Sequence, residues 1–89
     1  LGTAIMSFYV YLIIAKYKHN FISYVGYTSN LKKRLIQHNS SKGAKFTRGR
    51  VWKLIYQKRY LTKKKAMSEE YKLKKNFKLR KEIKEKFIK

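Results

Sequence analysis

Two runs of β-branched and aromatic residues near the start of the chain limit the possible folds most strongly. Residues 8–14 (Phe-Tyr-Val-Tyr-Leu-Ile-Ile) and 21–27 (Phe-Ile-Ser-Tyr-Val-Gly-Tyr) each have the length of one strand, and about five polar residues lie between them. Side chains of these types favour strands, and two such runs joined by a short polar segment are typical of an antiparallel hairpin. The sequence therefore predicts a sheet built around residues 8–27.

Helical and strand-like patterns follow the hairpin. Residues 28–30 (Thr-Ser-Asn) supply N-cap residues for one helix and Thr62 can cap another. Leu79, Ile83 and Phe87 recur at every fourth position, as in a helix with an apolar stripe. The predicted fold class is α/β (α+β): a small three-stranded, largely antiparallel sheet flanked by helices in the order ββαβαα. After the hairpin we expect a helix at 31–39, a basic loop at 40–50, a strand at 53–56, a helix from 63 to about 76, and a last helix.

The length of the chain, 89 residues, allows one domain. There is no proline, no internal repeat and no linker, so we interpret residues 7–89 as a single domain after an N-terminal extension at 1–6, with Met6 as a plausible alternative start. The uncharged residues 1–15 are too short for a transmembrane helix and lack the positive n-region of a signal peptide. No export signal is recognisable, which favours a cytoplasmic location.

The charge of the chain points to a polyanionic partner. It has 24 Lys and Arg against 4 Asp and Glu, a formal net charge of +20, and Asp is absent altogether. An AT-rich coding bias would favour lysine, but it would not exclude aspartate. So large a charge destabilises the compact state by self-repulsion unless a polyanion neutralises it. Nucleic acid is therefore the predicted partner, and a membrane surface is the alternative if the terminal basic helix acts alone.

Arg34 and His38 lie on the face that the first predicted helix packs against the sheet. At about 100° per residue, they share one arc with Leu31 and Leu35. Residues four apart are neighbours on a helix, so both side chains can reach one ligand. Alternatively, Arg34 follows the sheet edge to solvent and His38 is a satisfied boundary residue. For this pair alone, the second interpretation is favoured.

Glu70 is stronger evidence for a site, because it falls inside the apolar stripe predicted for the second helix. Ala66, Leu73 and Phe77 define that stripe, and Glu69 falls at its margin. A carboxylate on a packing face is costly unless it is paired or binds a metal. The structural alternative is an ion pair with Arg34. In a chain with so few acids, an inward-facing glutamate favours a ligand or an organiser of a phosphate site.

The basic loop and the strand tyrosines are weaker signals. Residues 42–50 (Lys-Gly-Ala-Lys-Phe-Thr-Arg-Gly-Arg) combine cations, an aromatic ring and glycines, which suits contact with a nucleic-acid backbone and stacking on a base. A solvated loop explains the segment equally well. Tyr9 and Tyr11 share a sheet face, Tyr24 lies on the neighbouring strand, and Gly26 would allow close approach of backbone at the strand end.

In their order, these motifs resemble the GIY-YIG nuclease superfamily, and most of all a small single-domain group of basic bacterial proteins. The resemblance covers roughly residues 7–87, and Tyr9 occupies the place of the glycine in the superfamily name, as it often does in that group. The matching segments are Tyr9-Val10-Tyr11, Tyr24-Val25-Gly26, Arg34, His38, Gly43-Ala44-Lys45-Phe46-Thr47-Arg48, and Glu70 followed by Leu73-Lys74.

The resemblance implies metal-dependent hydrolysis of DNA phosphodiester bonds, structure-selective or weakly specific, in DNA repair or recombination. Glu70 would hold one Mg²⁺ or Mn²⁺, Arg34 would clamp a phosphate oxygen, and Tyr24 would be the favoured general base, with Tyr11 or His38 assisting. A tyrosine base needs nearby cations to lower its pKa from about 10. DNA is expected over RNA, with no membrane and no obligate protein partner. The implied nucleic-acid contacts are Lys42, Lys45, Phe46, Arg48, Arg50 and Lys74.

A non-catalytic nucleic-acid-binding module of the same fold is the competing interpretation. It would have the same charge and the same basic loop but no turnover. Glu70 discriminates between the two, because a pure binder gains nothing from an acid that faces a phosphate.

Overall fold

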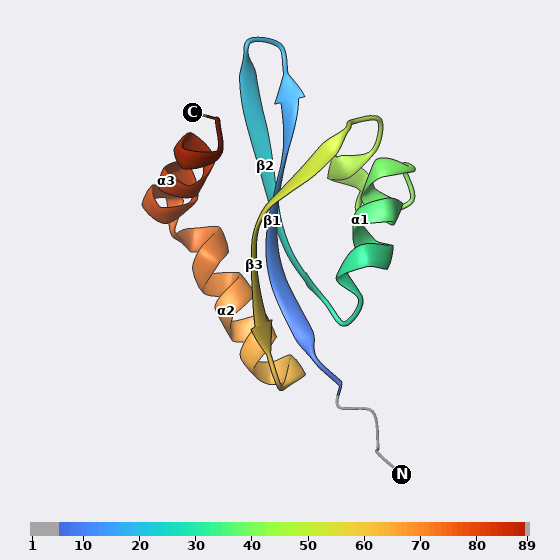
Figure 1. Cartoon of the computed structure of the whole chain (residues 1–89), viewed down its shortest axis with the longest axis vertical. Coiled ribbons are helices and arrows are strands. Elements are labelled where there is room, and N and C mark those ends of the chain that lie inside the picture. Colours follow the sequence, from blue (N-terminus) through green and yellow to red (C-terminus); the bar gives the residue numbers. More distant parts are fainter. Residues whose placement is uncertain (1–5, 89) are drawn as a thin grey trace.

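The chain folds into one three-stranded antiparallel sheet with one helix on one face and two on the other (Figure 1). The computed structural model describes residues 6–88, so nearly all of the predicted N-terminal extension lies outside the described residues. The predicted fold class and the order ββαβαα are confirmed. The elements are β1 (Phe8–Tyr17), β2 (Asn20–Thr28), α1 (Leu31–Asn39), a 3₁₀ turn (Lys45–Thr47), β3 (Trp52–Tyr60), α2 (Lys63–Lys75) and α3 (Phe77–Ile88).

β1 and β2 form the predicted hairpin, but its turn is shorter than expected. Tyr17 pairs with Asn20, so Lys18 and His19 alone connect the strands, instead of about five polar residues. Lys18 has a φ of 55°, in the left-handed region used by tight two-residue turns. The polar residues that flank the turn join the strands because pairing satisfies their backbone N–H and C=O groups.

β1 is the central strand, and β3 pairs along its other edge in the order β2-β1-β3. β3 is longer than the predicted strand at 53–56 and runs to Tyr60, which pairs with Phe8. Lys58 and Arg59, near its end, are exposed. On an edge strand, charged side chains reach water while the backbone still pairs with the neighbouring strand. The charged residues after position 56 therefore do not end β3, contrary to what the predicted bounds imply.

Both faces of β1 are buried, as its unbroken apolar run would suggest for a central strand. Residues 10–15 are each at most 2% exposed. On one face, Leu12 belongs to a cluster that includes Leu73 of α2. On the other face, Ile13 belongs to a cluster against which Leu35 of α1 packs. α1 and α2 therefore cover opposite faces of the sheet, as Figure 1 shows.

Of the candidate cap residues at 28–30, Asn30 caps α1, and Thr62 caps α2 as predicted. The side-chain oxygen of Asn30 accepts a hydrogen bond from the Lys33 backbone N–H at 3.0 Å, and the hydroxyl of Thr62 accepts one from Lys65 at 3.1 Å. Each satisfies one of the backbone donors that a helix start leaves free. These caps fix the first turns of α1 and α2, the helices that carry the candidate charged residues.

The break between α2 and α3 places Phe77 differently from the prediction. Asn76 has a non-helical backbone (φ −92°, ψ 75°), so Phe77 begins α3 and is 67% exposed, outside the buried stripe of α2. Of the predicted stripe of α3, Ile83 packs against the core, whereas Leu79 and Phe87 are 37% and 45% exposed. No helix within residues 6–88, α3 included, is both long and apolar enough to cross a membrane.

Candidate active site

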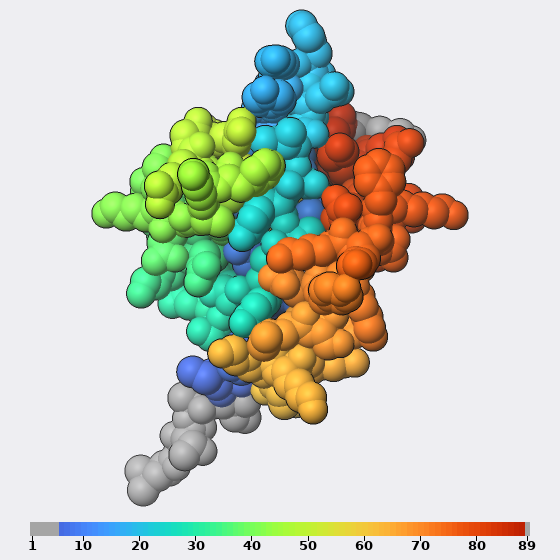
Figure 2. Space-filling model, turned by 180° about the vertical axis from the view of Figure 1, so that it is seen from behind, coloured from blue at the N-terminus to red at the C-terminus, as the bar shows by residue number. Residues whose placement is uncertain are grey.

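A cavity of about 430 Å³ opens along the outer edge of β2. Figure 2 shows this side of the molecule, with β2 between α1 and its following loop on one side and α2 and α3 on the other. Because β2 is an edge strand, side chains from both faces of the sheet reach the same space. Of the predicted catalytic residues, Tyr11, Tyr24, Arg34 and Glu70 line the cavity. The other lining residues are Phe8, Gly26, Tyr27, Thr28, Ser29 and Lys63.

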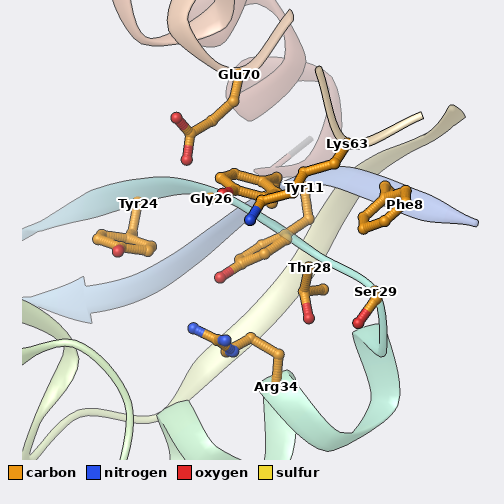
Figure 3. Close-up of a pocket in the computed structure, with 10 residues that line it drawn as sticks. Phe8, Tyr11, Tyr24, Gly26, Thr28, Ser29, Arg34, Lys63 and Glu70 are labelled. Carbon is orange, nitrogen blue, oxygen red and sulfur yellow. The ribbon is translucent and has the colours of Figure 1, made fainter. Parts of the chain in front are cut away.

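Arg34 and Glu70 enter the cavity from opposite faces of the sheet (Figure 3). Arg34 extends from α1, which confirms the predicted inward arc, and its guanidinium lies toward the hydroxyls of Tyr11 and Tyr24. Glu70 extends from α2 on the other side of β2. The hydroxyl of Tyr11 points into the space between Tyr24 and Arg34. The fold thus gathers groups from four elements at one point of the β2 edge.

A chain of hydrogen bonds leads inward from the cavity through His38. Tyr11 Oη lies 2.8 Å from His38 Nε2, His38 Nδ1 lies 2.8 Å from Thr47 Oγ1, and Thr47 Oγ1 donates to the Ala44 carbonyl oxygen at 2.8 Å. A hydroxyl has one proton to donate. Since Thr47 gives its proton to Ala44, it accepts from His38. His38 therefore carries its proton on Nδ1, and its Nε2 accepts the proton of Tyr11.

Burial keeps Tyr11 and His38 uncharged. His38 is 0% exposed and Tyr11 is 1% exposed. Burial lowers the pKa of His38, and the positive charge of Arg34 lowers it further. Burial also raises the pKa of Tyr11, and this effect outweighs the lowering by Arg34. The cation near Tyr11 therefore does not bring its pKa down as a lone tyrosine base would require, and Tyr11 is a donor paired with a neutral acceptor.

Two glycines make room for this hydrogen-bonded chain. Gly26 pairs with Tyr11 across the hairpin, and a Cβ at residue 26 would lie 2.6 Å from Tyr11 Cζ. The close approach expected at Gly26 is therefore made by the ring of Tyr11, not by backbone. A Cβ at residue 43 would lie 2.5 Å from His38 Nδ1. Gly43 thus lets the loop after α1 pack against the His38 imidazole, which places Thr47 within hydrogen-bonding distance of it.

Glu70 pairs with Lys74 on the next turn of α2, at 3.5 Å, and not with Arg34. The Glu70 side chain is 17% exposed and that of Lys74 is 50% exposed. A pair of this kind contributes about 0.3–0.5 kcal/mol when it is exposed, so a ligand can displace Lys74 at little cost. Arg34 takes part in no ion pair within residues 6–88. Arg34 and Glu70 are accordingly both available to a ligand.

The neighbouring acid, Glu69, lies outside the cavity. Lys65 and Lys72 pair with it at 3.4 and 3.1 Å. The hydrogen bond from Lys72, followed by that from Lys65, holds the pKa of Glu69 below its usual value. Adjacent glutamates therefore have separate surroundings, which makes Glu69 a natural control for Glu70.

Tyr24 begins a row of aromatic and cationic groups that continues out of the cavity. Its ring stacks with Phe46, with centroids 6.2 Å apart and planes at 21°, and meets His38 edge-on at 5.2 Å. The Arg50 guanidinium lies 5.6 Å from the Phe46 ring centroid and 5.1 Å from that of Tyr17. Phe46 is 50% exposed, and Arg50 is half-buried. The remaining predicted loop contacts, Lys42, Lys45 and Arg48, are exposed.

Comparison with known proteins agrees with this geometry. Residues 7–84 match the family described as the GIY-YIG catalytic domain, and every residue that lines the cavity falls within the match. This chain belongs to the GIY-YIG family. The resemblance carried by the ordered motifs is thereby confirmed.

Bacterial proteins named UPF0213 are similar to this GIY-YIG chain. One from Oceanobacillus iheyensis is 50% identical over 52 residues, 57% of this chain and 60% of that protein. One from Streptococcus pneumoniae is 48% identical over 60 residues, 66% of this chain and 61% of that protein. One from Staphylococcus haemolyticus is 43% identical over 65 residues, 72% of this chain and 78% of that protein. The chain spans less than two thirds of the length of the first two relatives. No solved structure gives a significant match.

Several residues at the GIY-YIG site have no functional prediction from the sequence, among them Gly43, Thr47 and Lys63. Gly43 and Thr47 lie in the segment that carries the resemblance, but their contacts with His38 arise only when the loop folds back. Lys63 begins α2 and lines the cavity. It is the first of three consecutive lysines, so the sequence contains no signal that separates it from its neighbours.

The donors in the cavity fit a hard divalent cation. Glu70 is the one carboxylate that lines it, and residues 6–88 contain no group of three His, Cys, Asp or Glu side chains able to hold a metal. Zinc sites need three or four such ligands. Mg²⁺ uses one or two carboxylates and fills its shell with water and phosphate oxygen, and Mn²⁺ also prefers oxygen ligands. Glu70 therefore fits Mg²⁺ or Mn²⁺.

Proposed function

We propose that this GIY-YIG domain is a metal-dependent endonuclease that hydrolyses DNA phosphodiester bonds. The observation that carries the proposal is the cavity at the β2 edge, which brings Arg34 and Glu70 together beside the hydrogen-bonded Tyr11–His38 pair. Phosphodiester hydrolysis needs a cation for the phosphate, an acceptor for the proton of water and stabilisation of the leaving oxygen. The family match supports the same reaction.

We assign the activation of water to Tyr11 rather than Tyr24. Tyr11 accepts a proton from the attacking water as its own proton moves to His38 Nε2, while the bond from water oxygen to phosphorus forms and the bond to the leaving oxygen breaks. Thr47 stabilises the imidazolium by accepting from Nδ1. The Tyr24 hydroxyl has no hydrogen-bond partner within the described residues, so no neighbouring group is placed to take its proton. Its ring instead forms the cavity wall beside His38.

Arg34 and Glu70 complete the proposed mechanism. Arg34 donates to a non-bridging oxygen and stabilises the charge that grows on phosphorus oxygens. Glu70 would hold Mg²⁺ or Mn²⁺, which would supply stabilisation of negative charge on the leaving oxygen. Lys74, released from Glu70, becomes free to contact a neighbouring phosphate. Lys63 adds a second cation to the cavity wall.

The proposed substrate is DNA rather than RNA, bound largely without regard to sequence. With a formal net charge of +20, backbone contacts dominate affinity, and such contacts position a protein without reading bases. We therefore propose a structure-selective or weakly specific activity, with a role in DNA repair or recombination. The exposed cations Lys42, Lys45 and Arg48, next to the aromatic row, supply further backbone contacts.

A non-catalytic DNA-binding module is the competing function, and Glu70 is the residue that separates the two. We expect Glu70→Gln to eliminate Mn²⁺-dependent cleavage of branched, nicked and single-stranded DNA. Because Glu70 loses only its pair with exposed Lys74, the free energy of unfolding should change by less than about 1 kcal/mol. DNA binding should persist or tighten, since one negative charge near a phosphate is removed.

The matched control is Glu69→Gln, which removes the neighbouring acid outside the cavity. It should leave both cleavage and DNA binding unchanged. Cleavage should also disappear for the wild type in EDTA. If the wild type cleaves none of these substrates with Mg²⁺ or Mn²⁺ and still binds them, the binding-module function is correct. A Glu70→Gln variant that melts far below wild type would identify Glu70 as a structural residue.

A further inference from the structure

A second hollow, of about 260 Å³, lies beside the candidate active site along the same edge of β2. Residues 21–23 of β2 form its floor, and Tyr24, the next residue, lines the first cavity. Phe46 forms one wall, and Phe77 and Arg80 of α3 form part of the other. Figure 2 shows the loop after α1 and α3 on the two sides of β2 at this level.

The walls of this hollow carry two exposed aromatic rings from separate elements. Phe46 is 50% exposed and Phe77 is 67% exposed. Isolated apolar residues on a surface need no explanation, but these two line one small concave space. The Arg80 guanidinium lies 5.7 Å from the Phe77 ring centroid and donates to the carbonyl oxygens of Leu73 and Lys74. Arg80 is thereby fixed between the end of α2 and the ring.

The hollow is continuous with the candidate active site through stacked rings. Phe46 stacks with Tyr24, and Tyr24 belongs to the first cavity. A DNA strand whose phosphate lies beside Arg34 would therefore pass Tyr24 and reach Phe46 next. Lys81 and Lys84 line the far wall, where they can contact the following phosphates.

We propose that this hollow, between Phe46 and Phe77, binds an unpaired nucleotide of the DNA strand next to the cleaved bond. The proposal rests on the endonuclease function and names its substrate class, DNA with a single-stranded segment beside a duplex. In a duplex, neighbouring base pairs cover the faces of each base, so only an unpaired base can stack on aromatic side chains. The lysines supply the charge complementarity to its phosphates.

The test measures binding in EDTA, where cleavage does not interfere. A blunt duplex is compared with the same duplex carrying a four-nucleotide thymidine tail, or a tail of the same length made of abasic sites. The two tails have equal phosphate charge, so their difference isolates base stacking. At 1–3 kcal/mol per stacked base, the wild type should bind the thymidine tail roughly 5- to 160-fold more tightly than the abasic tail, at one tail polarity.

Phe77→Ala should remove this preference for bases and leave affinity for the blunt duplex unchanged, whereas Phe77→Tyr should retain the preference. The matched control is Tyr71→Ala, which removes an exposed ring with a lysine over it, 5.0 Å from its centroid, on α2 away from both hollows. This variant should behave like the wild type.

The proposal would be overturned if the wild type bound duplexes with thymidine and abasic tails equally tightly. It would also be overturned if Phe77→Ala lost the same affinity for the blunt duplex as for the tailed duplex. Failure of the endonuclease function has a different signature, because the wild type would then cleave no substrate with Mn²⁺ whatever its tail preference.

Discussion

Replacing Thr47 by valine tests the inferred proton path at its innermost point. Valine has nearly the same shape as threonine but no hydroxyl, so the change leaves His38 Nδ1–H without its acceptor at 2.8 Å. The Ala44 carbonyl keeps its hydrogen bond from the backbone N–H of residue 47, at 2.9 Å. His38 then has no partner that holds its proton on Nδ1. A proton on Nε2 would instead prevent His38 from accepting from Tyr11.

The expected magnitudes follow from burial. Thr47 and His38 are both 0% exposed, and a buried donor without a partner costs about 1–3 kcal/mol of stability. In a domain of this size, that lowers the melting temperature by roughly 5–20 °C. General-base catalysis contributes about 10²–10⁴ in rate, so loss of the correct tautomer should slow single-turnover cleavage about 100-fold or more. DNA affinity should not change, because Thr47 is buried.

Thr47→Ser is the matched control, since it keeps the hydroxyl and loses only a methyl group. It should cleave close to the wild-type rate, and thermal melts followed by circular dichroism should show a modest decrease in stability. Single-turnover cleavage with Mn²⁺, measured well below the melting temperature, separates rate from folding. Wild-type cleavage by Thr47→Val, or an equal loss of rate in Thr47→Ser, would refute the proposed role of the tautomer.

Three further outcomes are expected. Arg34→Ala should remove about 3 kcal/mol of transition-state stabilisation and so slow cleavage roughly 10²-fold, with little change in DNA binding. Arg59→Ala, on the opposite edge strand, should change neither the rate nor the binding. Equal cleavage rates for the two variants would contradict the role of Arg34. Burial lowers the pKa of His38, so the unfolded chain, with a pKa near 6.5, takes up the proton first. The stability of the fold, measured by urea unfolding, should therefore fall as the pH drops below about 6.5, and it should fall less steeply in His38→Gln. Finally, log affinity for duplex DNA should decrease linearly with log salt concentration, by about 0.9 per phosphate neutralised, and a flat dependence would exclude the electrostatic mode of binding.

Local patterns in the sequence predict most of the fold. The hairpin, the caps and the inward arc of α1 depend on residues close together in the chain, and all three are confirmed. The predictions are wrong where long-range strand pairing or the backbone angles of a single residue determine where an element ends. β3 continues to Tyr60 because β1 offers partners as far as Phe8. The helix break at Asn76 has neither proline nor glycine to signal it, so the sequence pattern assigns Phe77 to the wrong helix stripe.

The site is predictable as a set of residues but not as a set of contacts. Tyr11 and His38 are 27 positions apart, and no local rule brings a strand hydroxyl to a helix imidazole. The partner of Glu70 shows the same limit, because Lys74 lies one turn away on the same helix and competes with the distant Arg34. The sequence analysis considers Arg34 alone as the partner of Glu70, and the packing of α1 and α2 on opposite faces leaves Lys74 in that place.

The location of the site at a sheet edge explains why so much charge accompanies so small a fold. Groups from both faces can meet only around a strand that no other strand covers, and β2 is such a strand. An uncovered edge exposes unpaired backbone groups that invite pairing with another chain. Two copies of this chain, each with a formal charge of +20, repel one another at low ionic strength, whereas DNA is attracted to the same edge. Under the proposed function, the charge both serves substrate binding and keeps the β2 edge open. It follows that high salt should both weaken DNA binding and promote self-association, and sedimentation velocity across the same salt series would show whether the two effects occur together.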